Sequence, residues 1–340
     1  MALRFMDSFD HIGSAGQLLY KWSSYGGNSP FWGSYGRFGT NGIKSGDNNT
    51  YWLKILDAQP TWIIGFAGQP GSVGSNTPFA HIADGGTEQC YLYALNTGLV
   101  QLRRGDGTVL ATGTKVLTAG VYYHFEWKLT IDNTTGASEL RINGATDHSV
   151  SGIDTQNSAN ATADRFWLGE NPVAAYMGWA FDDVHVCDGT GSAPYNNFLG
   201  ECRVECLFPN GNGNSSQLVG SDANSTDNYL LVDETAPNGD TDYVESSTVG
   251  NKDTYTYGNL TPTTGTVYAV QINPYAEKTD AGTRTIATIA RVSATEVDSS
   301  DLTLGATYGG QSEIRTTKPG GGSWSISDVN NAEFGVKVTA

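Results

Sequence analysis

The stretch that decides the fold runs from residue 120 to residue 132 and reads GVYYHFEWKLTID. Its odd-numbered side chains are large and apolar: Tyr123, Phe125, Trp127, Leu129 and Ile131. The side chains between them are Tyr122, His124, Glu126, Lys128 and Thr130. A period of two is typical of a β-strand with one buried face. This stretch therefore predicts a strand that contributes one side to an apolar core.

The same pattern continues through the first 188 residues. Short alternating or apolar runs, separated by turn residues, predict strands at 2–9, 37–40, 50–56, 62–67, 79–82, 90–95, 99–103, 109–112, 139–144, 166–170 and 181–188. A strand about every 10 to 15 residues is typical of a β-sandwich. We therefore expect an all-β domain over residues 1–188.

The second half also has the composition of a β protein. Residues 189–200 read GTGSAPYNNFLG, lose the alternation and predict a connector. Strands are then predicted at 201–207, 228–232, 242–246, 253–257, 267–275, 284–292, 302–307, 313–316 and 334–338, whereas 209–216, PNGNGNSS, is predicted to be a polar loop. We expect a second, smaller β-sandwich over residues 201–340.

Charge and composition exclude some classes of partner. The 340 residues include 35 acidic and 19 basic ones, for a formal net charge of −16. A nucleic-acid phosphate backbone is bound through lysine and arginine, so nucleic acid is not expected as a partner. An acidic surface keeps a protein soluble, and calcium or a basic docking partner are the alternatives.

The termini and the apolar runs bear on location. The first ten residues, MALRFMDSFD, lack the basic and apolar regions of a secretion signal, so we expect a protein made and used without that export route. No apolar run reaches the roughly 20 residues that span a bilayer. Membrane insertion is therefore not expected.

The four cysteines are Cys90, Cys187, Cys202 and Cys206. If residues 201–207 form a strand, Cys202 and Cys206 lie about 13 Å apart, at about 3.3 Å per residue. That separation is too long for a disulfide bond. We expect four free thiols.

The first domain resembles the concanavalin A-like and laminin G-like jelly rolls. The motifs are YHFEWK at 123–128, RING at 141–144 and FDDVHV at 181–186, with an early Phe9-Asp10. The resemblance is strongest over residues 110–188. It implies a jelly-roll sandwich whose last strand pairs near its first.

The junction resembles that of tailed-bacteriophage virion proteins in which a jelly roll precedes a second β domain. The motifs are DDV at 182–184, FLGECRVE at 198–205 and PNG at 209–211, followed by WS at 324–325 and NNAEFGV at 330–336. The resemblance implies a non-enzymatic particle protein, made in the host bacterial cytoplasm and located in the virion. A tail- or fibre-associated accessory or adhesion role is expected first, with a capsid decoration protein (cement or head fibre) as the alternative.

The expected partners follow from that role. They are other virion proteins of the tail, collar or capsid, further copies of the chain, and a glycan of the host surface. Particle proteins commonly form closed rings, and a trimer is the first expectation. A carbohydrate-binding module unconnected to a particle is the competing class.

Catalysis is not expected. Some jelly rolls hydrolyse polysaccharides with two closely spaced glutamates, but the pattern Glu-x-Asp-x-x-Glu is absent from this sequence. Glu126 and Asp132 lie about 20 Å apart along one predicted strand, too far for a pair of carboxylates to act together. No catalytic residue is therefore assigned, and no cofactor beyond a possible structural calcium.

Two groups of residues are candidate binding sites. Asp182, Asp183 and Asp188 flank a strand near the predicted rim of the sandwich, where oxygen ligands suit calcium; hydrogen bonding at the strand end is the alternative. The segment 20–37 is rich in glycine and aromatic residues: Trp22, Tyr25, Phe31, Trp32 and Tyr35. These side chains predict a contact with virion neighbours, a glycan site, or packing within the domain.

Overall fold

The computed structural model describes residues 3–27, 31–170 and 176–340. The chain divides into two compact units, Met1–Val204 and Glu205–Ala340. Both consist mainly of antiparallel strands, so the predicted all-β fold class is confirmed. No helix within the described ranges is long and apolar enough to cross a membrane.

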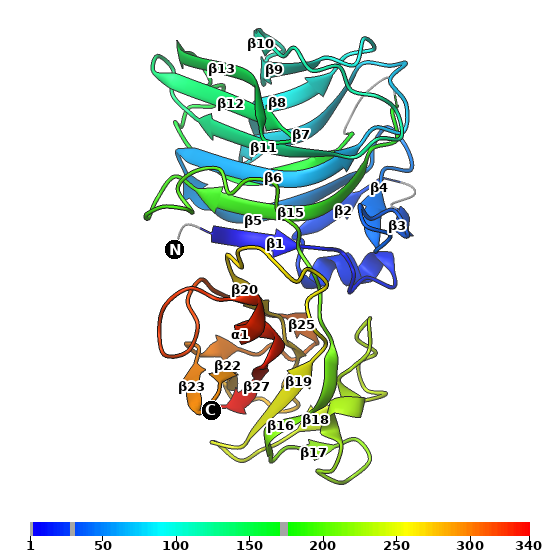
Figure 1. Ribbon diagram of the computed structural model, residues 1–340, viewed down its shortest axis with the longest axis vertical. Helices are drawn as coiled ribbons and strands as arrows, with labels where there is room; N and C mark the ends of the chain where they lie inside the picture. Colours follow the sequence, from blue (N-terminus) through cyan, green and yellow to red (C-terminus); the bar gives the residue numbers. More distant parts are fainter. Residues whose placement is uncertain (1–2, 28–30, 171–175) are drawn as a thin grey trace. The chain divides into compact units, whose positions relative to one another are not determined.

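The first unit is a sandwich of two antiparallel sheets, drawn as two stacked layers in Figure 1. The first sheet contains, in spatial order, β13 (Ala145–Ile153), β12 (Gly136–Ile142), β11 (Tyr123–Thr130), β6 (Thr61–Gln69), β15 (Ala180–Asp188), β4 (Gly42–Lys44) and β3 (Phe31–Gly33), with β1 (Leu3–Asp7) paired to β15. The second sheet contains β10 (Val109–Thr112), β9 (Val100–Arg104), β8 (Thr87–Ala94), β7 (Thr77–Asp84), β14 (Ala163–Gly169), β5 (Tyr51–Gln59) and β2 (Ser24–Gly26). A short 3₁₀ helix, η1 (Ala15–Tyr20), precedes β2.

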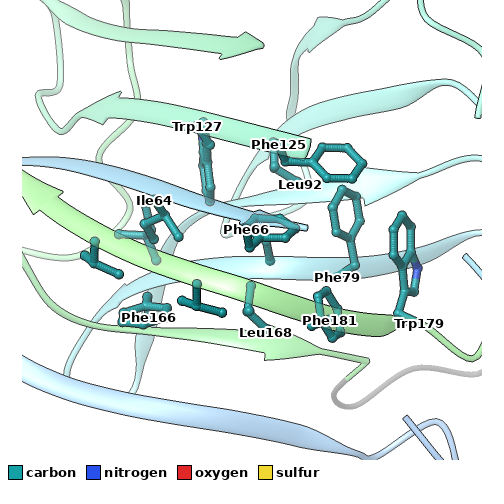
Figure 2. Close-up of a cluster of buried hydrophobic side chains, with 14 of the residues drawn as sticks. Ile64, Phe66, Phe79, Leu92, Phe125, Trp127, Phe166, Leu168, Trp179 and Phe181 are labelled. Atoms are coloured by element: carbon teal, nitrogen blue, oxygen red, sulfur yellow. The ribbon is translucent and has the colours of Figure 1, made fainter. Parts of the chain in front are cut away.

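Register explains why the deciding stretch lies at the centre of this sandwich. Phe125 of β11 lies opposite Phe66 of β6, and Trp127 lies opposite Ile64. All four side chains face the second sheet and belong to the core (Figure 2). Burying such a side chain contributes about 1.5–3 kcal/mol. The alternation read from the sequence is therefore the alternation between core and outer face.

Aromatic pairs join the two layers of this core. The Phe79 ring of the second sheet stacks on the Trp179 ring at a centroid distance of 4.2 Å. Phe66 and Phe125 stack at 5.2 Å within the first sheet. Because these rings are fully buried and in contact, the two layers are fixed against each other over the middle of the sandwich (Figure 2).

In the first unit the strand predicted at 37–40 is wrong, and the strands β2, β3, β4 and β13 were not predicted. Residues 37–40 form a turn rather than a strand, because the Arg37 N–H donates to Asp182 Oδ2 instead of to a neighbouring strand. Strand β13 was not predicted, because it lies at the sheet edge and its exposed polar residues show no alternation.

The second unit is built on one antiparallel sheet with several short ribbons. The sheet contains β16 (Pro209–Ser216), β19 (Lys252–Tyr257), β27 (Ala332–Val338), β22 (Thr285–Val292) and β23 (Thr295–Asp298), with β24 (Leu302–Thr303) paired to β22. The ribbons pair β17 (Val219–Gly220) with β18 (Val244–Glu245), β20 (Val270–Ile272) with β26 (Glu313–Arg315), and β21 (Tyr275–Ala276) with β25 (Gly309–Gly310). Two short helices complete the unit, the 3₁₀ helix η2 (Asn228–Leu231) and α1 (Ile326–Asn330).

The segment predicted as a loop at 209–216 is strand β16, so that prediction was wrong. Its backbone pairs with β19, and Asn214 N–H donates to Glu333 Oε2 at 2.7 Å. A Cβ at Gly213 would clash with Glu333 and Thr254, so glycine permits the close approach. Composition alone predicted a loop, whereas backbone pairing with distant residues produced a strand.

Three further predictions for the second half also need correction. Residues 201–207 form no strand, and residues 228–231 form the helix η2. The run 267–275 is broken into β20 and the start of β21. Residues 196–204 bond to side chains of the first sheet, which is why the predicted connector 189–200 lies within the first unit.

Candidate functional site

The outer face of the second sheet carries an unusual set of side chains. On β8, Cys90 and Leu92 belong to the core, so Tyr91 and Tyr93 point outward. On β14, Phe166 and Leu168 are core residues and Trp167 points outward. By the same alternation His81 of β7 points outward, next to the core residue Ile82.

Strand register brings these outward side chains into one row across the sheet. Trp167 lies opposite His81, His81 opposite Tyr91, and Tyr91 opposite Arg103. The His81 ring stacks between its neighbours, with centroid distances of 4.5 Å to Trp167 and 5.8 Å to Tyr91. Tyr91, His81 and Trp167, together with Tyr93 and Arg103 beside them, are called the aromatic row below.

Arg103 and Tyr93 form one end of the aromatic row. The Arg103 guanidinium carbon lies 3.7 Å from the centroid of the Tyr93 ring. Its Nε and Nη2 also donate to the side-chain oxygen of Gln101, at 3.0 and 2.7 Å. Burial raises the pKa of Tyr91, so its phenol stays protonated at neutral pH.

His81 lies at the centre of the aromatic row and is only 1% exposed. Its Nδ1 lies 2.7 Å from Glu88 Oε1, which fixes the orientation of the ring. Its Nε2 and the indole N–H of Trp167 have no partner within the protein. Buried polar atoms normally have partners, so these two lack the hydrogen bonds that such atoms usually make.

The aromatic row combines apolar ring surface with hydrogen-bonding groups. Tyr91, Tyr93, Trp167 and Arg103 are all partly exposed, and Ile55 of β5 on the same face is 45% exposed. The outward face of an antiparallel sheet is usually polar. Partly exposed rings beside a guanidinium, an amide and a carboxylate can bind a ligand that presents both C–H faces and hydroxyls.

Sequence reasoning missed the aromatic row, although a signal was present. The triplet Phe166-Trp167-Leu168 and the stretch Cys90-Tyr91-Leu92-Tyr93 place aromatic residues at positions that alternate with core residues. In a strand, such residues cannot all face the core. What the sequence does not show is that β7, β8 and β14 are neighbours, so that their outward residues meet.

The outer face of the first sheet differs, because it is covered by residues 196–204, called the strap below. His124 and Glu126 of β11 and His185 of β15 point outward, yet each is at most 3% exposed. The Gly200 N–H donates to Glu126 Oε1 at 2.9 Å. The Cys202 N–H donates to His124 Nε2 at 3.3 Å.

Burial sets the protonation of these groups. Loss of solvent lowers the pKa of His124 to about 2 and that of His185 to about 4, so both rings are neutral at neutral pH. Loss of solvent also raises the pKa of Glu126, opposed by the N–H groups of Gly200 and Leu199. The covered face therefore presents neutral imidazole rings. Glu126 and His124 on this face each accept a main-chain N–H of the strap.

The three aspartates predicted to bind calcium do not come together. Asp182 Oδ2 accepts the Arg37 N–H at 2.8 Å, and Asp183 Oδ2 lies 3.1 Å from Arg37 Nε. Asp188 pairs instead with Arg4, at 2.8 Å. Burial and the neighbouring Asp183 raise the pKa of Asp182. In the described ranges no three or more histidine, cysteine, aspartate or glutamate side chains gather where they could hold a metal ion.

The aromatic residues predicted as a contact or glycan site also have different positions. Trp22 is 2% exposed, stacks on Phe9 and donates its indole N–H to Asp7, so it is a core residue rather than a surface contact. Tyr25 of β2 packs against the same core. Tyr35 is half-buried, with Lys44 Nζ 5.2 Å from its ring centroid. The side chains of Phe31 and Trp32 lie outside the described part of the structure.

The cysteines are free, as predicted. Cys90 and Cys187 are buried, and Cys202 and Cys206 are partly buried. Burial raises the pKa of the Cys202 thiol to about 12, which keeps it protonated and unreactive at neutral pH.

A shallow pocket lies near the turn between β12 and β13, apart from the aromatic row. Thr114, Lys115, Asn143 and Asp147 line it. Asp147 Oδ1 accepts the N–H groups of Thr114 and Lys115, and Oδ2 has no partner. The pocket is a smaller candidate site than the aromatic row.

No protein-family model and no curated protein matches this chain. Solved structures with a similar fold include a sialidase (16% identity, TM-score 0.39), covering 54% of this chain and 18% of that chain. Alginate lyase Aly36B is similar at 12% identity and TM-score 0.38, over 54% of this chain and 95% of its own. Domain 4 of AbnA, a GH43 extracellular arabinanase from Geobacillus stearothermophilus in complex with arabinotriose, is similar at 15% identity and TM-score 0.38, over 55% and 92%.

These similarities concern the β-sandwich fold alone. This chain spans less than a fifth of the sialidase, and the identities are 12–16%. They give no evidence on activity, substrate or partner.

Proposed function

We propose that this protein is a non-enzymatic bacteriophage structural protein whose first unit binds glycans through the aromatic row, in a tail- or fibre-associated adhesion role. The observation that favours glycan binding is the row Trp167, His81 and Tyr91 on a partly exposed sheet face. The particle setting rests on the sequence resemblance at residues 182–211 and 324–336.

The chemistry of the aromatic row favours a sugar over a wholly apolar ligand. Aromatic rings contact the C–H groups of a sugar, while polar groups at the ring edges bond its hydroxyls. Gln101, Glu88 and Arg103 supply such groups, and His81 Nε2 and the Trp167 N–H are unpartnered. A wholly apolar partner would cover the polar ends of Gln101, Glu88 and Arg103 without bonding them, which is unfavourable.

The proposal of a non-enzymatic role is supported by how the other outward acid and base groups are used. Glu126 and His124 each accept a main-chain N–H from the strap. They therefore hold the chain's own backbone in place. Incubating the full chain with any glycan it binds, and measuring new reducing ends or unsaturated sugars, checks this; turnover would contradict the proposal.

A glycan array tests the binding function. The full chain and its Trp167→Ala variant are applied side by side, with Val116→Ala as a control, because Val116 is 56% exposed and outside the aromatic row. We expect at least one glycan class to bind the wild type and the control. Removing the indole should weaken binding about tenfold or more, equivalent to about 1.4 kcal/mol. An array with no bound glycan would contradict the proposal.

The particle setting has a separate test. The copy number of this chain in purified particles is measured by quantitative mass spectrometry against the major capsid protein. A few to a few dozen copies agree with the proposed tail or fibre position, and hundreds would favour capsid decoration. Absence from particles, with glycan binding intact, would favour a carbohydrate-binding module unconnected to a particle.

A further inference from the structure

We propose that the outer face of the first sheet is a groove that binds an extended peptide main chain, and that a second copy of this chain can fill it by exchanging its strap. In the structure the chain's own strap, residues 196–204, is the occupant. This inference is independent of glycan binding, because it concerns the opposite face of the sandwich.

The contacts show that the groove recognises backbone. Glu126 accepts the Gly200 N–H at 2.9 Å, His124 the Cys202 N–H at 3.3 Å and Asp183 the Val204 N–H at 2.7 Å. Every second residue of this part of the strap (200, 202 and 204) thus donates its main-chain N–H to a side chain of the first sheet. This spacing is that of an extended chain, whose successive N–H groups point to opposite sides.

Two basic residues bind carbonyl groups of the same strap. Lys128 Nζ donates to the Asn196 carbonyl at 3.3 Å, and Arg37 Nη2 to the Cys202 carbonyl at 3.1 Å. The Arg141 guanidinium also lies 4.2 Å from the centroid of the Phe198 ring. The groove therefore offers both acceptors and donors to a main chain, and its Arg141 packs on the Phe198 ring of the strap.

The floor of the groove is shaped for this occupant. A Cβ at Gly65 of β6 would clash with the His185 ring, so that ring lies directly over the Gly65 backbone. His185 in turn stacks on His124 at a centroid distance of 5.8 Å. Glu126 Oε2 and His124 Nδ1, both deeply buried, have no partner. These two atoms can therefore still form hydrogen bonds, either with the occupant or with water between the occupant and the sheet.

The proposed exchange requires the strap to leave its own groove. Residues 201–204 have no regular secondary structure and pair with no strand. The preceding residues 189–194 are exposed and include Gly189 and Gly191, and in the proposed exchange they act as the hinge. In an exchanged dimer or ring, the strap of one copy would make the same contacts with the groove of the next.

A peptide titration tests the groove. In the full chain, residues 197–203 are replaced by a glycine-serine linker of equal length, which removes the side chains of Phe198 and Leu199 and leaves a flexible main chain that an added peptide can displace. A fluorescent peptide with the sequence of residues 196–204, with serine at the cysteine position, is then titrated by anisotropy. We expect saturable binding to the linker variant and at least tenfold weaker binding to the wild type, whose groove is filled. A folded linker variant that binds no peptide would overturn the proposal.

A matched variant separates groove binding from nonspecific binding. Glu126→Gln and Asp183→Asn, added to the linker variant, replace two acceptors by side chains that also present N–H groups. Peptide affinity should fall at least tenfold. Unchanged affinity would show that the peptide binds elsewhere, and would overturn the assignment of the groove.

A hinge deletion tests the exchange, and it also serves if the linker variant fails to fold. Removing residues 190–193 shortens the hinge by up to about 13 Å of extended chain. The strap then cannot return to its own groove, and light scattering should give a mass of two or more copies. A folded monomer would exclude strap exchange. An oligomer that persists when Glu126→Gln and Asp183→Asn are added would exclude the groove as its cause.

Discussion

The two outer faces of the sandwich differ in what they present and in whether they are covered. The second sheet presents the aromatic row and leaves it partly exposed, whereas the first presents His124, Glu126 and His185 and buries them under the strap. Rings tolerate partial exposure because they combine apolar surface with polar edges. Buried carboxyl and imidazole groups need hydrogen-bonding partners, and the strap supplies main-chain N–H groups. The covered face therefore binds the chain's own strap, whereas the open face keeps its rings partly exposed.

The covered face should be the more sensitive of the two to substitution. Arg37→Ala removes the partner of Asp183, which is 1% exposed, together with the bond to the Cys202 carbonyl. Breaking a buried ion pair should lower the free energy of unfolding by about 3 kcal/mol. Urea unfolding followed by tryptophan fluorescence measures it.

A matched control exists in the second unit. Arg284 pairs with Asp280, and both side chains are about half exposed. Arg284→Ala should change the free energy of unfolding by no more than about 0.5 kcal/mol. Equal effects of the two substitutions would show that the strap contacts contribute no more than a surface pair.

Acid should remove the stability that the two histidines of the covered face contribute. The pKa of His185 is about 4 and that of His124 about 2 in the folded chain, below the ordinary value of 6.5. At these two rings the unfolded chain therefore binds more protons than the folded one below pH 6.5, so the stability that the histidines contribute is lost as the pH falls, whereas the raised pKa values of Asp182 and Asp183 act in the opposite direction. At pH 5 the loss should be about 2 kcal/mol for each histidine.

The same acid effect can be assigned by substitution. His124→Gln keeps an acceptor for the Cys202 N–H and removes one titrating ring. Relative to the wild type, the unfolding free energy at pH 5 minus that at pH 7 should become more positive by about 2 kcal/mol. An unchanged pH dependence in this variant would mean that groups other than His124 cause it.

Substitutions on the open face should change glycan affinity more than the free energy of unfolding. Trp167→Ala should weaken glycan affinity about tenfold or more. Because Trp167 is partly exposed, we expect its loss to cost less stability than the 3–5 kcal/mol of a fully buried aromatic residue. Calorimetric titration with a glycan found on the array, beside thermal unfolding, measures the two effects. A large loss of stability with unchanged affinity would mean that the aromatic row is structural.

The smallest effect is expected at the edge of the aromatic row. Tyr93→Phe removes a hydroxyl that donates to the Asn76 carbonyl at 3.3 Å and leaves the ring under Arg103. Affinity should change less than threefold, about 0.6 kcal/mol. Calorimetric titration checks this; a tenfold loss would assign a direct ligand contact to that hydroxyl.

Local pattern predicted the layers of the fold, and long-range pairing produced what it missed. The alternation of Phe125 and Trp127 with His124 and Glu126 correctly separates core from outer face. The same rule identifies Trp167 as outward-facing once Phe166 and Leu168 are assigned to the core. That His81 stacks on Trp167 depends on β7 pairing with β14, which are distant in sequence. The local sequence pattern therefore shows which side chains face the core and which face outward, but it does not show which outward side chains from different strands meet.

The strap and strand β16 show that a local sequence pattern can also predict the wrong backbone conformation. The stretch from Glu201 to Leu207 has the alternation of a strand, yet its N–H groups at Cys202 and Val204 bond to side chains of the first sheet. The polar stretch 209–216 became strand β16 because β19 offered it a partner. In both places the available hydrogen-bonding partner, rather than composition, decided the backbone conformation.

The most direct test of the difference between the two faces is hydrogen exchange measured by mass spectrometry, with and without a glycan identified on the array. The account predicts slower exchange in β8 and β14 when the glycan is bound, with residues 196–204 unchanged. Protection confined to residues 196–204, or to neither region, would contradict the claim that the open face of the second sheet is the binding site.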